Sequence, residues 1–151
     1  MKIEFTVQDI PPKKNGATSM WSKPSEAPRI ISLRKAALNA MKREDFNECF
    51  HSSVKLELTL FAPHSRFNFT GGSYIGDLDT FITGVCDSLQ AAHQNLKVAH
   101  QLFQNPQNRE IDFMHSLMIS NDSQVVSIAA SKVIINDKLQ PYYKITIETV
   151  E

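Results

Sequence analysis

Two aspartates separated by one residue, Asp77 and Asp79, precede an apolar pattern typical of a helix. Phe81, Val85 and Leu89 recur every four residues, which places their side chains on one helix face. In extended backbone, residues i and i+2 point to the same side, so both carboxylates can face one hard cation. Mg²⁺ is usually held by one or two carboxylates with water and phosphate oxygens. The pair therefore predicts either a magnesium site or an N-cap, for which aspartate is a preferred residue.

A third aspartate, Asp122, stands between an apolar run and a further stretch rich in β-formers. The strand expected after it covers residues 125–135 and contains Lys132. Residues 136–138 are Asn-Asp-Lys, which favours a turn, and an alternating pattern over 142–150 predicts a final strand. Together these segments predict an antiparallel β-hairpin at the C-terminus.

Two alternating segments in the first half of the chain predict half-buried strands, at residues 2–8 and 54–61. Pro11-Pro12 ends the first and Pro63 ends the second, because proline cannot donate a hydrogen bond to a neighbouring strand.

Helical periodicity predicts two helices that must pack on these strands, over residues 32–50 and 80–104. Ser32 is expected to cap the first helix, and Ile30-Ile31 before it is expected to form a short strand. The predicted fold class is α/β (α+β): a mixed sheet of about four strands with a C-terminal β-hairpin, packed with two or three helices.

The chain has 151 residues, which predicts a single domain over 1–151. Its two cysteines, Cys49 and Cys86, form no CxxC pair, and a reducing compartment fits this usage. No apolar run approaches the length of a membrane span, and the N-terminus lacks the apolar region of a signal peptide. We therefore expect a cytoplasmic protein with no membrane partner.

The net charge is zero, but residues 1–45 carry nine basic and five acidic residues while 46–151 carry seven and eleven. A basic front beside an acidic centre predicts a phosphate-facing surface, with an unremarkable charged surface as the alternative. The basic loop with Lys13, Lys14 and Trp21 could contact a phosphate backbone and stack on a base. The alternative is a solvated loop with Trp21 folded onto the core.

The order of these pieces resembles the RusA-type Holliday junction resolvases over nearly the whole chain. The matching pieces are Pro11–Asn15 after the first strand, the strand ending at Pro63, Asp77-Leu78-Asp79 opening a helix, Asn121-Asp122-Ser123-Gln124-Val125-Val126, and the final hairpin. The resemblance implies a homodimeric endonuclease for four-way DNA junctions that uses Mg²⁺, with Mn²⁺ as an alternative ion.

The resemblance also implies roles for particular residues. The essential acidic residues of the family fall on Asp77, Asp79 and Asp122, which are implied to be both catalytic and metal-binding. Lys132 matches a family lysine and is implied to act at the scissile phosphate. The residues implied to contact DNA are Lys13, Lys14, Asn15 and Arg29.

Three residues depart from the family pattern: Gly76, Thr80 and Thr83 stand where a basic residue, an asparagine and a lysine are common. They favour an alternative function, a catalytically degenerate module that only binds DNA or a protein. Retention of three aspartates favours the enzyme, because clustered carboxylates repel one another without a cation. A small-molecule hydrolase is disfavoured, since there is no nucleophile motif and no glycine-rich phosphate loop.

Overall fold

The computed structural model of the protein describes residues 1–14, 20–92, 105 and 114–150. Its centre is a four-stranded mixed sheet in the order β1-β4-β2-β3. The strands are β1 (Lys2–Val7), β2 (Val54–Pro63), β3 (Val125–Ile135) and β4 (Tyr142–Thr149). The helices are α1 (Ala27–Arg43), α2 (His64–Phe67) and α3 (Leu78–Leu89), with short 3₁₀ turns at Met20–Ser22 (η1) and Asp122–Gln124 (η3). The predicted α+β class with a four-stranded mixed sheet is confirmed.

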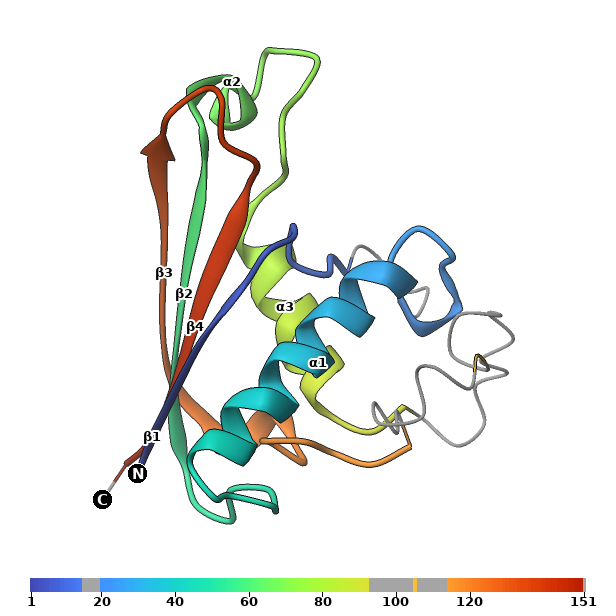
Figure 1. Ribbon diagram of the computed structural model, residues 1–151, viewed down its shortest axis with the longest axis vertical. Coiled ribbons are helices and arrows are strands. Elements are labelled where there is room, and N and C mark those ends of the chain that lie inside the picture. Colours follow the sequence, from blue (N-terminus) through green and yellow to red (C-terminus); the bar gives the residue numbers. More distant parts are fainter. Residues whose placement is uncertain (15–19, 93–104, 106–113, 151) are drawn as a thin grey trace.

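The helices α1 and α3 lie on one side of the sheet (Figure 1). The core fills the space between them, because alternate residues of β1, β2 and β4 are buried there, including Phe5, Leu58 and Ile145. Phe81 and Val85 of α3 are fully buried against this layer, which confirms the apolar face predicted for that helix.

The last two strands run antiparallel and are joined by residues 136–141, as expected for a C-terminal β-hairpin, but β2 lies between them. β2 pairs parallel with β3 and antiparallel with β4, so Leu58 has Ala130 on one side and Ile145 on the other. The physical reason is burial: β2 carries the strongest apolar alternation in the chain, and a central position buries that face most completely.

The prediction for the first helix is wrong at both ends, because α1 runs from Ala27 to Arg43. Pro28 lies in its first turn, where the fixed φ of proline suits a helix start. Ile30 and Ile31 are helical rather than extended. Ser32 lies within the helix, where its hydroxyl donates to the Pro28 carbonyl at 3.0 Å and to Asp9 at 3.1 Å.

The second helix begins close to the predicted position and ends at Leu89, because Gln90 is extended. The predicted continuation to residue 104 lies mostly outside the described residues. Both cysteines are free thiols. Within the ranges that the structure describes, none of the helices is long and apolar enough to cross a membrane.

Candidate functional site

Asp77 occupies the N-cap position of α3, but its carboxylate makes no capping hydrogen bond. Its backbone is extended, with φ −88° and ψ 142°, and its carbonyl accepts a hydrogen bond from the Thr80 hydroxyl at 2.8 Å. The carboxylate instead accepts a hydrogen bond from the Tyr74 hydroxyl at 2.7 Å. The capping alternative therefore does not account for the Asp77 side chain, which faces the exposed surface before the helix.

Asp79 lies in the first turn of α3 and is also exposed. Both carboxylates act on Tyr74: its hydrogen bond to Asp77 raises the pKa of the phenol, and burial and the charges of Asp77 and Asp79 add to this. The two carboxylates therefore lie near one phenol at the N-terminus of a helix, where backbone N–H groups favour negative charge. The extended backbone assumed for the pair is present at Asp77 only, because Asp79 already lies in the helix.

Lys132 of β3 reaches the same phenol. Its Nζ donates to the Tyr74 hydroxyl at 3.2 Å and lies 4.9 Å from the centroid of the Tyr74 ring. The Nζ is also 5.4 Å from the centroid of the Phe67 ring, within the range of a cation–π contact. Tyr74 therefore connects a lysine on the edge strand with an aspartate at the start of α3.

Lys13 brings a second cation next to Gly76, the residue that precedes Asp77. Gly76 is buried and has a φ of +130°, and a Cβ atom at this position would lie 3.2 Å from the Lys13 Nζ. A side chain at residue 76 would therefore be strained and would displace Lys13. A lysine from another part of the chain therefore occupies the space beside Gly76.

The segment Pro11–Lys14 crosses the middle of α3. A Cβ on Gly84 would lie 2.0 Å from the Pro12 carbonyl oxygen, so only glycine allows this contact. Beyond the crossing, the Lys14 backbone N–H donates to the Thr80 carbonyl at 3.3 Å. The Lys14 ammonium lies 3.3 Å from the Asp87 carboxylate, in an ion pair on the C-terminal half of the helix.

Asp122 lies close to the C-terminal end of α3, although it belongs to a different segment of the chain. Its carboxylate accepts a hydrogen bond from the side-chain amide of Gln90. Burial raises the pKa of the Cys86 thiol to about 12, and the charge of Asp122 adds to this shift. Burial also raises the pKa of the Asp87 carboxyl, with Lys14 opposing the shift and Asp122 adding to it.

The structure therefore does not bring Asp122 into the pair formed by Asp77 and Asp79. Eight residues of helix separate Asp79 from Asp87, which corresponds to roughly 12 Å at 1.5 Å per residue. Among the described residues, no group of three or more His, Cys, Asp or Glu side chains is arranged to hold a metal ion. The donor set at the candidate site is a pair of carboxylates.

The sequence around Asp122 has a local structural role. The Asn121 side chain accepts a hydrogen bond from the Ser123 N–H at 2.9 Å, and the Gln124 side chain accepts one from the Asn121 N–H at 3.2 Å, which completes a capping box. The Gln124 amide also donates to the Phe50 carbonyl at 2.7 Å. This part of the motif fixes the start of β3 and the position of Asp122.

The other predicted DNA contacts lie in different environments. Asn15 is outside the described residues, and Arg29 pairs with Glu26 at 3.0 Å. Trp21 is buried, with 5% of its surface exposed, which confirms the alternative that this ring packs on the protein. Of the basic loop, the structure describes Lys13 and Lys14, and both lie along α3.

Sequence reasoning missed two residues of this region, Tyr74 and Arg34. Arg34 is fully buried, which is unusual for a charged residue. Its guanidinium donates to the carbonyls of Ser88, Gln90 and His115 at 2.7, 3.0 and 2.6 Å. A signal existed, because Arg34 falls four residues after Ile30 and therefore on the apolar stripe of α1.

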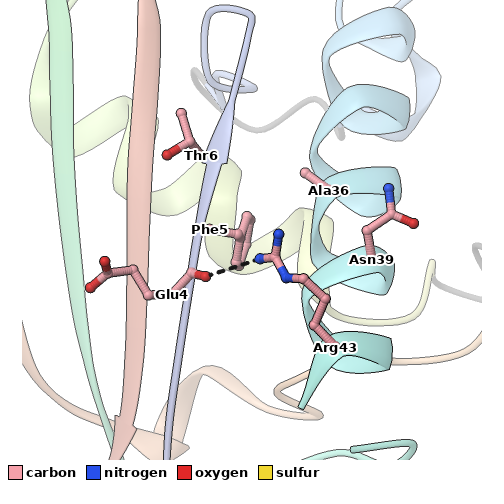
Figure 2. Close-up of a pocket in the computed structure, with 6 residues that line it drawn as sticks. All are labelled: Glu4, Phe5, Thr6, Ala36, Asn39 and Arg43. Atoms are coloured by element: carbon pink, nitrogen blue, oxygen red, sulfur yellow. Dashed lines mark hydrogen bonds between the residues drawn. The ribbon is translucent and has the colours of Figure 1, made fainter. Parts of the chain in front are cut away.

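Two cavities lie elsewhere on the protein. One, of about 340 Å³, lies between β1 and α1, where Arg43 donates to the Glu4 carbonyl at 3.5 Å (Figure 2). Another, of about 410 Å³, is lined by residues that include Phe46 and Leu117. Neither is lined by Asp77 or Asp79, whose carboxylates lie on the surface. A surface site suits a macromolecular substrate better than an enclosed small molecule.

No family model and no curated protein matches this chain.

Proposed function

We propose that the protein is a cytoplasmic, magnesium-dependent endonuclease that cleaves branched DNA such as a four-way junction. One observation carries the proposal: Asp77 occupies a helix N-cap position, but its exposed carboxylate is bound by the Tyr74 hydroxyl and does not cap the helix, whose first turn contains Asp79. Lysines from two other elements lie close to this pair, Lys13 and Lys132. Carboxylates for a metal beside cations for phosphate form a donor set suited to phosphodiester hydrolysis.

Asp77 and Asp79 are the residues that would hold Mg²⁺, or Mn²⁺ in its place. Two carboxylates fit an ion that keeps several waters and takes phosphate oxygens from its substrate. A metal bound there would supply an activated water and neutralise charge on the phosphate. Asp122, hydrogen-bonded by Gln90 at the other end of α3, is not needed for this donor set.

The lysines provide the remaining electrostatic function. The Tyr74 hydroxyl bridges Lys132 and the Asp77 carboxylate: it donates to Asp77 at 2.7 Å and accepts from Lys132 at 3.2 Å. A phosphate beside Asp77 would have this ammonium and that of Lys13 as neighbouring cations. Removal of one such charge can cost roughly 10²–10³ in rate.

Cleavage of a synthetic four-way junction with magnesium, compared with a linear duplex of the same sequence, tests the function. We expect the parent protein to cut the junction preferentially and Asp79→Asn to lose cleavage. Asp77, not Asp79, occupies the N-cap position, so a loss cannot arise from capping. Asp137→Asn, in the exposed turn after β3, is the matched control and should retain activity.

Thermal melts with magnesium and with chelator separate the enzyme from the binding module. At a concentration tenfold above Kd, magnesium should stabilise the parent by about 1.4 kcal/mol, and Asp79→Asn by much less. Junction binding without cleavage, together with equal magnesium shifts in both proteins, would favour the binding module. The separation of Asp122 from the pair is the observation that supports this second candidate.

We further propose that the protein acts as a homodimer through the edge strand β3. Four large apolar side chains of β3 are exposed, Val126 at 56%, Ile128 at 53%, Val133 at 39% and Ile134 at 60%. Ile128 and Ile134 are in register with the buried residues Leu56 and Ala62 of β2. The core-facing layer of the sheet thus continues onto β3, which carries a single charge, Lys132, over eleven residues. Long, uncharged edges of this kind favour pairing with another strand.

The sequence of β3 suits antiparallel pairing with a second copy about a two-fold axis at Ala130. This register uses the whole strand and sets Val126 against Ile134 of the second copy, with the small residues Ala129 and Ser131 near the axis. Only a residue on the two-fold axis lies opposite the same residue of the second copy. Ala130→Cys should therefore form an intermolecular disulfide under oxidation, since paired Cα atoms lie about 4.5–5.5 Å apart.

Ser127→Cys is the matched control for this register, because it would face Val133 of the second copy and should remain a free thiol. Sedimentation should show a dimer for the parent at micromolar concentration. A monomeric parent that cleaves junctions would contradict the homodimer without affecting the proposed activity.

A further inference from the structure

We propose that Tyr74 is a positioning residue that keeps the Lys132 ammonium from pairing directly with the Asp77 carboxylate. The inference rests on the proposed function, because it assigns Asp77 to the binding of a divalent cation. In this role Tyr74 leaves the Asp77 carboxylate able to bind a metal ion although Lys132 lies close to it.

The geometry places a neutral group between two opposite charges. The Tyr74 hydroxyl donates to Asp77 Oδ1 at 2.7 Å and accepts from Lys132 Nζ at 3.2 Å. Lys132 also lies over the rings of Tyr74 and Phe67, at 4.9 and 5.4 Å from their centroids. These contacts hold the ammonium at the phenol rather than at the carboxylate.

The backbone around Tyr74 is fixed on both sides. The Ile75 N–H donates to the Arg66 carbonyl at 2.8 Å, and the Arg66 Nε donates to the Ser73 carbonyl at 2.8 Å. Ile75 is buried, which anchors the segment to the core. The phenol therefore extends from a constrained segment, as a positioning group requires.

The chemistry of the phenol suits this role. A neutral hydroxyl satisfies one lone pair of the Asp77 carboxylate and leaves the carboxylate charge in place for a metal ion. A tyrosine phenol is protonated at neutral pH, so the Tyr74 hydroxyl remains a donor to Asp77. A direct Lys132–Asp77 ion pair would offset the negative charge that attracts the metal.

Tyr74→Phe removes the hydroxyl and keeps the ring. Lys132 should then pair with Asp77, and magnesium affinity, measured by titration with the metal alone, should fall about tenfold, as is usual when a group orienting a metal ligand is lost. Adding Lys132→Met to Tyr74→Phe should restore most of that affinity, which a merely structural role for Tyr74 would not do. Tyr142→Phe, which alters a ring stacked on Phe61, is the matched control.

A measurement without metal completes the test. In chelator, the coupling between Lys132→Met and Asp77→Asn in a double-mutant cycle of melting temperatures should be small in the parent and larger in the Tyr74→Phe background. Equal coupling in both backgrounds would overturn the inference, as would unchanged magnesium affinity in Tyr74→Phe. A protein that binds magnesium and meets both expectations, but never cuts a junction, would refute the proposed function and leave the role of Tyr74 intact.

Discussion

The two ends of α3 carry the same kind of charged residue in opposite surroundings. At the N-terminal end, Asp77 and Asp79 are exposed, and the Asp77 carboxylate accepts a hydrogen bond from the neutral Tyr74 hydroxyl. At the C-terminal end, Asp87 is paired with Lys14 and Asp122 accepts from Gln90. The buried guanidinium of Arg34 closes that end.

This difference shows which carboxylates are available for chemistry. A carboxylate that already has a lysine or an amide partner loses those contacts when it binds a metal, so part of the binding free energy is offset. At the N-terminal end, the helix dipole stabilises the negative charges of the two carboxylates. These carboxylates give up few contacts when they bind a metal ion. The closed end is therefore structural, and the open end is the candidate site.

The largest expected effect lies at the closed end. Arg34→Met should lower the free energy of unfolding by about 3–5 kcal/mol, because three carbonyls lose their donor and each unsatisfied buried group costs roughly 1–3 kcal/mol. Urea unfolding monitored by circular dichroism measures the change. Arg43→Met, on an exposed part of the same helix, is the control and should stay within about 0.5 kcal/mol of the parent. Similar losses in the two variants would show that Arg34 does not hold this end of the helix.

An intermediate effect is expected at Gly84, where Pro11–Lys14 crosses between the two ends. In most helices Gly→Ala stabilises by roughly 0.5–1 kcal/mol, but here the new methyl group would meet the Pro12 carbonyl. Gly84→Ala should therefore destabilise by about 1–3 kcal/mol, the usual cost of overpacking. Gly72→Ala is the control, because its Cβ would have nothing within 4 Å. A more stable Gly84→Ala protein would mean that the crossing segment moves aside at no cost.

The smallest effect concerns the pH dependence of stability through Asp87. Its pKa in the folded protein is raised, mainly by burial, so folding favours the protonated carboxyl. Its contribution is fully present below its ordinary pKa of 3.8 and is lost as pH rises through the raised value. Asp87→Asn should remove this decline in unfolding free energy, measured by urea titrations across the acidic range. An unaltered pH profile would indicate that Lys14 cancels the cost of burying Asp87.

The sequence by itself determined the features that depend on local periodicity. The alternating segments became β1, β2 and β4, and the stretch rich in β-formers became β3, all with nearly the predicted bounds. Asp77-Leu78-Asp79 opens a helix whose apolar face is buried. These properties follow from residues within a few positions of one another, since a side-chain period of two or 3.6 residues decides which face is buried. The place of Asp77 and Asp79 at the start of this helix was predictable for the same reason.

Only the tertiary structure decided what these elements meet. It inserted β2 between the last two strands, buried Arg34 under the end of α3, and set Asp122 apart from Asp77 and Asp79. It also brought Lys132 to Tyr74, a contact across 58 positions of sequence. Such contacts depend on how whole elements pack to bury the most apolar surface and satisfy buried polar groups, and a local pattern carries no information on that choice.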